Sequence, residues 1–142
     1  MSFGPAVSPT GNGFMVVVPS AACPCASGSR FAECCQQLHN GEIAPSPERL
    51  MRSRYAAFVV GNEHYLRATW HPLTRPEDLE LDPQLRWNKL EIIDAGESGD
   101  EGFVAFRAAW HIGDESGQLS EHSRFRRAYG RWYYVDGDVA PS

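Results

Sequence analysis

The spacing of hydrophobic residues changes from a helical to a strand period along the chain. From residue 46 to residue 60 apolar side chains recur every three or four positions, which predicts one amphipathic helix. Its apolar positions are Leu50, Met51, Tyr55, Phe58 and Val59. Ser46 and Pro47 are typical of a helix start, and Gly61 is typical of a helix end. A second short helix is expected from Asn62 to about Thr69.

The second half of the chain favours strands. Four segments rich in alternating apolar and polar residues are predicted as strands, over residues 87–95, 103–112, 119–128 and 131–136. Short polar links join them, so an antiparallel meander is the simplest pairing. Residues 74–86 stay ambiguous, because Pro76 can open a helical turn and Pro83 would close it. Helices followed by strands predict an α+β fold.

Composition narrows the class of protein. The chain has 142 residues, of which 42% are hydrophobic and 22% charged, enough for one domain with a small appendage. The formal net charge of −5 argues against general nucleic-acid binding. We find no apolar run long enough for a transmembrane helix, so no membrane role is expected.

The chain divides into three predicted parts. Residues 1–20 are rich in glycine and proline and are predicted to be a flexible tail, in which Met1 and Met15 are both possible starts. Residues 21–42 hold the cysteines, and residues 43–142 form the main domain. Because no lysine or arginine precedes Arg30, a secretory signal is not indicated, and we expect a cytoplasmic protein.

All four cysteines lie in one short segment, as two close pairs separated by eight residues: Cys23, Cys25, Cys34 and Cys35. Two such pairs can supply the four thiolates of a tetrahedral zinc site. Disulfides or free thiols are the alternatives, but structural disulfides are rare in a reducing compartment. Four thiolates leave no open position for water, so the predicted zinc is structural. We expect Arg30 to offset the negative charge, and His39 to lie outside the ligand set.

The cysteine segment resembles a known zinc knuckle. Residues 23–35 read Cys-Pro-Cys-Ala-Ser-Gly-Ser-Arg-Phe-Ala-Glu-Cys-Cys, which is similar to the SEC-C motif found at the end of SecA. The resemblance implies zinc ligation by all four cysteines. Ala26 stands where that family often has glycine, and Arg30 and Glu33 stand where it has lysines. A basic knuckle that docks an acidic partner is therefore not implied.

The whole chain from residue 21 to residue 138 resembles the bacterial YchJ-like family. The matching motifs are Met51–Phe58, Tyr65-Leu66, Thr69–Pro72, Glu121, Ser123–Phe125 and Gly130–Gly137. The resemblance implies a nuclear transport factor 2-like (cystatin-like) fold, in which a curved antiparallel sheet wraps around helices like a cone. It implies a fold and a metal, but no particular reaction.

A cone-shaped fold can enclose a pocket, and the pocket is where we expect function. The candidate pocket residues are Arg54, Tyr55, Trp70, His71, Trp110, Glu121, Ser123 and Trp132. His71 and Glu121 are candidates for an acid–base pair, but the pattern favours a packed helix end for His71 and a pair with an arginine for Glu121. Arg52 and Arg54 flank Ser53, so one of them is expected to point inward. The favoured role for it is an ion pair with Glu121 or Asp136, and the alternative is binding of a carboxylate or phosphate ligand.

Three functions remain open from the sequence. The favoured one is a binding or adaptor module that recognises a protein or a small ligand through the knuckle or the cone. The alternatives are a small-molecule enzyme with acid–base groups in the cone, and a scaffold that self-associates as a homodimer. Four arginines, Arg124, Arg126, Arg127 and Arg131, interleave with aromatic residues as in single-strand binders, but the net acidity makes nucleic acid an unexpected partner.

Overall fold

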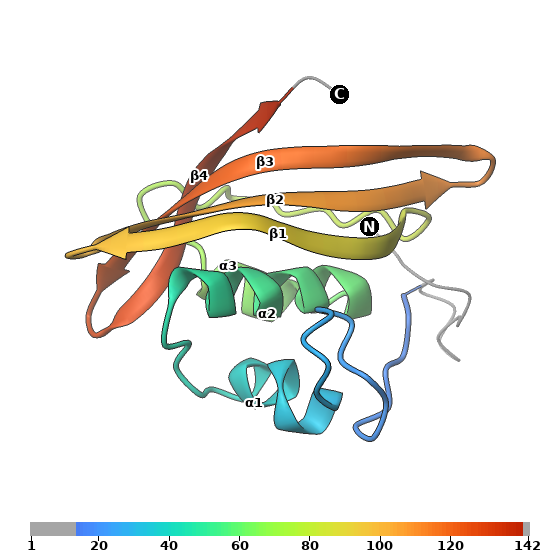
Figure 1. Ribbon diagram of the computed structural model, residues 1–142, viewed down its shortest axis with the longest axis horizontal. Helices are drawn as coiled ribbons and strands as arrows, with labels where there is room; N and C mark the ends of the chain where they lie inside the picture. The colour runs from blue at the N-terminus through green and yellow to red at the C-terminus, as the bar shows by residue number, and fades with distance from the viewer. Residues whose placement is uncertain (1–13, 141–142) are drawn as a thin grey trace.

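The computed structural model describes residues 14–140 of the chain. A short 3₁₀ helix η1 (Phe31–Glu33) and helix α1 (Cys35–His39) precede the longest helix, α2 (Pro47–Val60), and helix α3 (Glu63–Ala68). The strands follow in sequence as β1 (Arg86–Ser98), β2 (Glu101–Ile112), β3 (Glu115–Ala128) and β4 (Arg131–Ala140). Helices therefore come first and strands second, as the sequence predicts (Figure 1).

The strands form one antiparallel sheet in the order β1-β2-β3-β4, which confirms the meander. Every strand is longer than the sequence pattern predicts, and two-residue turns join them. The polar ends of the hairpins, such as Glu115 paired with Ile112, extend the ladder although they bury little side chain. Backbone hydrogen bonds hold these ends together, so the alternation of apolar residues understates their length.

Local capping explains both helix boundaries that the sequence predicts. The Ser46 hydroxyl accepts a hydrogen bond from the Arg49 N–H at the start of α2, and Gly61 ends the helix in the left-handed region at φ 73°. The Asn62 side chain accepts from the Tyr65 N–H and starts α3. Residues 74–86 contain no helix, and the loop is instead tied back where the Arg67 guanidinium donates to the Pro76 carbonyl.

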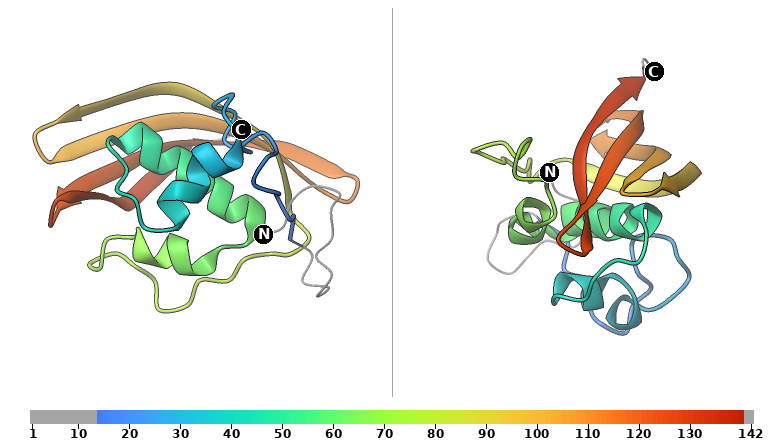
Figure 2. Two further views of the ribbon diagram at one scale, coloured as in Figure 1. Left: turned by 90° about the horizontal axis from the view of Figure 1, so that it is seen from below. Right: turned by 90° about the vertical axis from the view of Figure 1, so that its left-hand side faces the viewer.

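Helix α2 lies between two layers. The curved sheet covers one side of α2, and the cysteine segment with η1 and α1 covers the opposite side (Figures 1 and 2). Residues on most sides of α2 are therefore buried, including Leu50, Ala56, Ala57 and Val59. The main core joins α2 and α3 to the sheet, and a smaller core joins the cysteines to Ala56. This arrangement confirms the α+β class and the curved sheet around helices.

The segment before the cysteines packs against the molecule from residue 14 onward. Met15 and Val17, which belong to the predicted tail, are partly buried against the main core, and Val17 also contacts the cysteine core. The rest of that tail, residues 1–13, lies outside the described residues. The question whether Met1 or Met15 is the start therefore stays a prediction. Among residues 14–140 no helix combines the length and the hydrophobicity needed to cross a bilayer.

Candidate metal centre and ligand cavity

A tight loop folds the two cysteine pairs onto each other. A bridge between Ala22 and Arg30 closes the loop, and the Cys23 N–H donates to the Ser29 carbonyl at 2.9 Å. Inside the loop Ala26 and Gly28 both adopt positive φ, at 66° and 91°. The chain then enters η1 and α1, which place the second pair beside the first.

The four sulfur atoms have the separation that a tetrahedral metal requires. All four cysteine side chains are buried, and their Sγ atoms lie within 4.8 Å of one another. The Cys25–Cys34 and Cys34–Cys35 sulfur separations are 3.6 and 4.0 Å. Zinc–sulfur bonds of about 2.3 Å at tetrahedral angles place sulfurs about 3.8 Å apart. No disulfide joins any of them. The donor set therefore fits one metal ion of the zinc type.

The four thiols do not ionise independently. Hydrogen bonds with Cys23 and Cys35 lower the pKa of Cys25, whereas the hydrogen bond with Cys25 raises the pKa of Cys23 to about 11. The pKa of Cys35 is raised by its hydrogen bonds with Cys23 and Cys25. The cluster without metal therefore keeps protons that a metal ion would have to displace on binding.

Helix α2 supplies the positive charge beside the cluster. The Arg49 guanidinium donates to the Cys35 Sγ at 3.4 Å, and that of Arg52 donates to the Cys25 carbonyl at 2.6 Å. The Ser27 hydroxyl lies 3.1 Å from the Cys34 sulfur. Arg30 is exposed, and the hydrogen bond from a guanidinium to a cluster sulfur comes from α2, so the predicted role of Arg30 stays a prediction. Only folding brings Arg49 to the cysteines, so no local pattern could reveal it.

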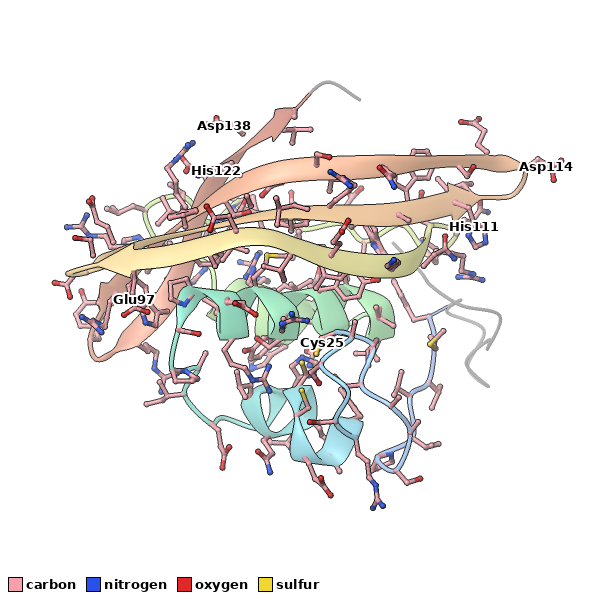
Figure 3. All side chains as sticks on the ribbon, in the orientation of Figure 1. Cys25, Glu97, His111, Asp114, His122 and Asp138 are labelled. Atoms are coloured by element: carbon pink, nitrogen blue, oxygen red, sulfur yellow. The ribbon has the colours of Figure 1, made fainter. Side chains whose placement is uncertain are left out.

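His39 lies near the cluster but is not among its ligands. Its Nε2 donates to the Ser53 carbonyl at 2.8 Å, and its ring packs against Phe31 and Tyr65. Burial lowers the pKa of His39, which keeps the imidazole neutral. The side chain of His39 therefore connects α1 to α2. Figure 3 shows Cys25 on the side of α2 away from the sheet, whereas His122 lies above the sheet.

A cavity of about 240 Å³ lies on the other side of α2, between the helix and the sheet. Its walls are mainly aromatic and aliphatic, with an arginine and a glutamate among them. The lining residues are Met51, Arg54, Tyr55, Phe58, Trp70, Trp87, Phe106, Ala108, Leu119, Glu121 and Tyr134. Four of the eight predicted pocket residues therefore do come together: Arg54, Tyr55, Trp70 and Glu121.

Arg54 is the buried charge of this cavity. The residue is only 3% exposed, and its Nη1 donates to the Leu66 carbonyl at 2.8 Å and to the Thr69 hydroxyl at 2.7 Å. The guanidinium carbon lies 5.1 Å from the Trp70 ring centroid and 4.5 Å from that of Tyr134. Burial lowers the pKa of Arg54 to about 10, so the side chain stays charged at neutral pH.

The predicted buried ion pair of Arg54 does not form among residues 14–140. Asp136 pairs with Arg124 instead, at 2.6 Å. Glu121 lines the same cavity, but its Oε2 accepts from the Ser123 hydroxyl at 2.6 Å and from the Tyr134 hydroxyl at 3.2 Å. Tyr134 thus stands between the two charges, with its ring near Arg54 and its hydroxyl on Glu121.

Ser123 adjoins the cavity only through Glu121, and three predicted pocket residues lie elsewhere. His71 caps a turn, where its Nδ1 accepts from the Leu73 N–H at 3.1 Å. Trp110 lies beside Gly117 on the neighbouring strand, and buried Trp132 lines a separate cavity of about 140 Å³. The acid–base pair of His71 and Glu121 is therefore not assembled in this cavity.

Tyr134 lines the cavity and contacts both charged groups, but it is not among the pocket residues predicted from the sequence. Its signal was available, because alternation along the last strand places Tyr134 on the same face as Trp132. Phe58, Trp87 and Leu119 carry no such signal, since their approach to one cavity depends on how the sheet curves over α2.

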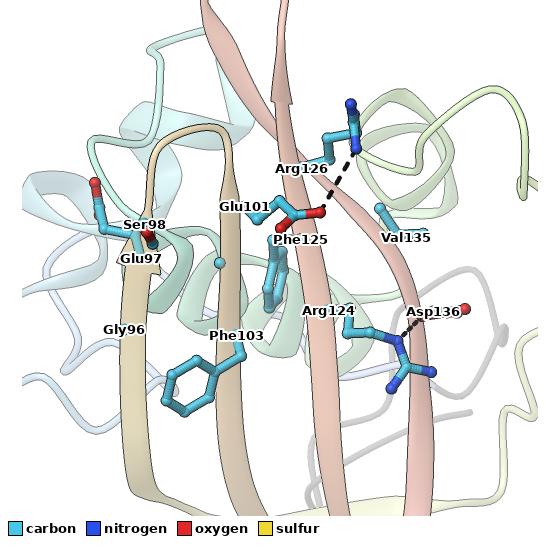
Figure 4. Close-up of a pocket in the computed structure, with 11 residues that line it drawn as sticks. Gly96, Glu97, Ser98, Glu101, Phe103, Arg124, Phe125, Arg126, Val135 and Asp136 are labelled. Carbon is cyan, nitrogen blue, oxygen red and sulfur yellow. Dashed lines mark hydrogen bonds and ion pairs between the residues drawn. The ribbon is translucent and has the colours of Figure 1, made fainter.

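A groove of about 550 Å³ lies near the β1–β2 turn (Figure 4). Its two arginines are both matched within the sheet. Arg124 pairs with Asp136 at 2.6 Å, and Arg126 lies 3.8 Å from Glu101. Neighbouring carboxylates therefore already pair with both arginines of the groove, whereas Arg54 in the cavity has no such ion pair.

Comparison with known proteins places the chain in a family. The model of the YchJ middle NTF2-like domain matches residues 46–137. A UPF0225 protein from Streptomyces coelicolor is 46% identical over 125 residues, covering 85% of this chain and 98% of that protein. A UPF0225 protein from Chromobacterium violaceum is 47% identical over 128 residues, covering 84% of this chain and 94% of that protein.

Two solved structures share the fold. The solution structure of a SEC-C motif-containing protein from Rhodopseudomonas palustris superimposes with a TM-score of 0.74 and 32% identity, covering 84% of this chain and 98% of that one. The crystal structure of a SEC-C motif-containing protein from Psychrobacter arcticus gives a TM-score of 0.73 and 25% identity, covering 87% and 85%. The matched domain, the relatives and the cysteine cluster agree: the chain belongs to the YchJ-like (UPF0225) family, with an NTF2-like domain over residues 46–137.

Proposed function

We propose that the protein is a small-ligand-binding module whose helical layer is stabilised by one structural zinc ion. The zinc occupies the four cysteines, and the ligand occupies the cavity between α2 and the sheet. The observation that carries the proposal is this cavity, because about 240 Å³ of space remains among mainly aromatic and aliphatic side chains, and the charged groups of Arg54 and Glu121 lie separately in its walls.

The zinc part rests on the sulfur separations and on the SEC-C motif in the related structures. Elemental analysis of the purified protein is expected to give about one zinc per chain. Since all four cysteines of the chain lie in the cluster, a thiol reagent should modify none of them before chelation and all of them afterwards. The Cys34→Ser, Cys35→Ser double variant should lose the metal, and zinc retained in it would contradict the assignment.

The ligand part rests on the shape and chemistry of the cavity. Ligand sites are typically concave and apolar, with a few polar groups that fix orientation. The walls here are mainly rings and aliphatic chains, and Arg54, Glu121 and Tyr134 provide the polar groups. Catalysis has less support, because His71 does not line the cavity and no other histidine does.

A cavity-filling variant tests the ligand part. Leu119 lies on the cavity wall, whereas the adjacent Ser120 points to the opposite face of β3. We expect Leu119→Trp to abolish binding of small aromatic molecules detected by ligand-observed NMR, and Ser120→Trp to leave it intact. The screen should contain acids, amines and neutral compounds of similar size. Equal binding by both variants would place the ligand elsewhere.

Binding to a protein partner and assembly into a homodimer stay predictions from the sequence. Nucleic-acid binding is not part of the proposal. Three of the four arginines that interleave with aromatics form ion pairs within the sheet: Arg124 with Asp136 and Asp138, Arg126 with Glu101, and Arg127 with Asp100. Charges matched in this way are less available to a phosphate backbone.

A further inference from the structure

The Arg54 guanidinium is incompletely matched in its buried site. An arginine has five N–H donors, and the hydrogen bonds to Leu66 and Thr69 come from Nη1 alone. No carboxylate among residues 14–140 lies within ion-pair distance of it. A buried charge without a counter-ion is costly, and such groups are usually paired. Glu121 lines the same cavity of about 240 Å³ but attracts Arg54 only from beyond ion-pair distance, so a ligand carboxylate there can pair with the guanidinium directly.

We propose that the cavity binds a small monocarboxylic acid with an apolar, preferably aromatic, body, and that its carboxylate pairs with Arg54. This inference rests on the proposed ligand-binding function and specifies the class of ligand.

The planar guanidinium selects the carboxylate. The Nε and Nη2 donors make no hydrogen bond within residues 14–140, and the fork they form matches the two oxygens of a carboxylate. The Trp70 ring, 5.1 Å from the guanidinium carbon, and the Tyr134 ring, 4.5 Å from it, hold the fork in place. A phosphate dianion would need further donors, and the lining contains no lysine and no second arginine.

The remaining walls select an apolar and small body. Phe58, Phe106 and Leu119 line the cavity together with Met51 and Ala108. A volume of about 240 Å³ is below the range of ~300–1,000 Å³ that is usual for drug-sized ligands. A single ring or a short aliphatic chain therefore suits the space.

Glu121 gives the ligand a direction. Its carboxylate lines the same cavity and repels an anion, so the acid end of the ligand turns to Arg54. Ser123 and Tyr134 both donate to Glu121 and hold it in place. A Cβ at Gly137 would overlap the Glu121 carboxylate, so glycine at this position leaves room for it.

Matched pairs of acids and neutral analogues test the charge requirement. Benzoate and phenylacetate would be compared with benzamide and phenylacetamide, by calorimetry or ligand-observed NMR on the full zinc-loaded chain. We expect each acid to bind at least about tenfold more tightly than its amide, since the charge-assisted bidentate contact is lost. Equal affinities would overturn this inference and leave the proposed ligand site standing, whereas no binding by any compound would overturn both.

Three variants locate the contact. Arg54→Met should lose the preference for the acid, while Arg54→Lys should keep only part of it because an ammonium lacks the fork. Glu121→Gln should tighten binding of the acid several-fold and leave the amide unchanged, because it removes a like charge at constant shape. An unchanged affinity for the acid in Glu121→Gln would contradict the proposed orientation.

The folding of Arg54→Met distinguishes ligand binding from a purely structural role. Arg54→Met removes a buried charge that has no ion-pair partner but also its hydrogen bonds to Leu66 and Thr69, so these effects offset each other and we expect at most a small drop in the denaturation midpoint of the ligand-free protein. A large loss of stability in this variant would identify Arg54 as a structural group. The Glu121→Gln comparison would still decide the ligand question, since it does not depend on Arg54→Met folding.

Discussion

A single α2 side chain, Arg49, places a guanidinium on the zinc-type cluster. Its Nη1 donates to the Cys35 sulfur at 3.4 Å. Four thiolates and Zn²⁺ leave a net negative charge, which this donor stabilises. We therefore expect Arg49→Met to weaken zinc binding by about tenfold or more without unfolding the protein, measured by chelator competition. Arg30→Met, which changes an exposed arginine of the same loop, should leave zinc affinity unchanged, and equal effects would contradict a specific role for Arg49.

Ala26 occupies a backbone conformation that favours glycine. Its φ is 66°, in the left-handed region. A left-handed conformation costs a residue with a Cβ about 1 kcal/mol. Ala26→Gly should therefore raise the stability of the zinc-loaded protein by roughly 0.5–1 kcal/mol in denaturant unfolding. The control Ala32→Gly lies in η1, where glycine should destabilise. Destabilisation by Ala26→Gly would mean that the loop relieves this strain in another way.

The residues of the metal cluster could be predicted from the sequence, and most of the cavity could not. Cys23 and Cys35 are close in the chain, so their spacing alone limits what they can bind. Arg54 and Tyr134 meet only because β4 crosses over α2, and no sequence period records that contact. The prediction that His71 lines the pocket is wrong for a similar reason. Its neighbours Trp70 and Pro72 indicate a helix end, but they do not show to which side the His71 ring points.

At the scale of elements, α2 is in contact with two different layers. Ala56 packs in the cysteine core and Ala57 packs in the main core, and both are fully buried. The hydrophobic pattern of α2 predicts only the face that packs on the sheet. The opposite face contacts the cysteine segment through a small residue, Ala56, and through Arg49 and Arg52, which do not add to an apolar pattern. Helix ends were predictable since Ser46 and Gly61 act locally, whereas strand ends were not, since backbone pairing extends them.

Because Ala56 and Ala57 pack in different cores, replacing each of them by leucine should have a different effect. Leucine at either position overfills a packed core and costs about 1–3 kcal/mol. We expect Ala56→Leu to accelerate zinc release to a chromophoric chelator, and Ala57→Leu to lower the denaturation midpoint while zinc release stays near wild type. If Ala57→Leu accelerated zinc release as much as Ala56→Leu, the two cores would not be separable.

At the scale of the whole molecule, the knuckle and the NTF2-like domain share α2. Metal that binds the folded state adds to its stability. Because Arg49 and Arg52 reach from α2 to the cysteine loop, chelation should lower the melting temperature of the entire chain in one cooperative transition. The measurement is near-ultraviolet circular dichroism of the tryptophans, which lie in the NTF2-like domain. An unchanged tryptophan transition after zinc removal would mean that the two parts unfold independently.

The meander also determines how the sheet can assemble. Each strand pairs with its neighbour in the chain, and every link between two strands has two residues. The backbone adopts positive φ in each link, at Gly99 in the first, at Gly113 in the second, and at both Tyr129 and Gly130 in the third. Short links cost little loop-closure entropy, so each hairpin can form before the next strand is made. Helix α2 precedes the sheet in the chain and contacts β1, β2 and β4, so we expect the docking of α2 on the sheet to be the slow step of folding. During synthesis on a ribosome, α2 emerges before all four strands, and its contact with β4 can form only after the last strand is completed.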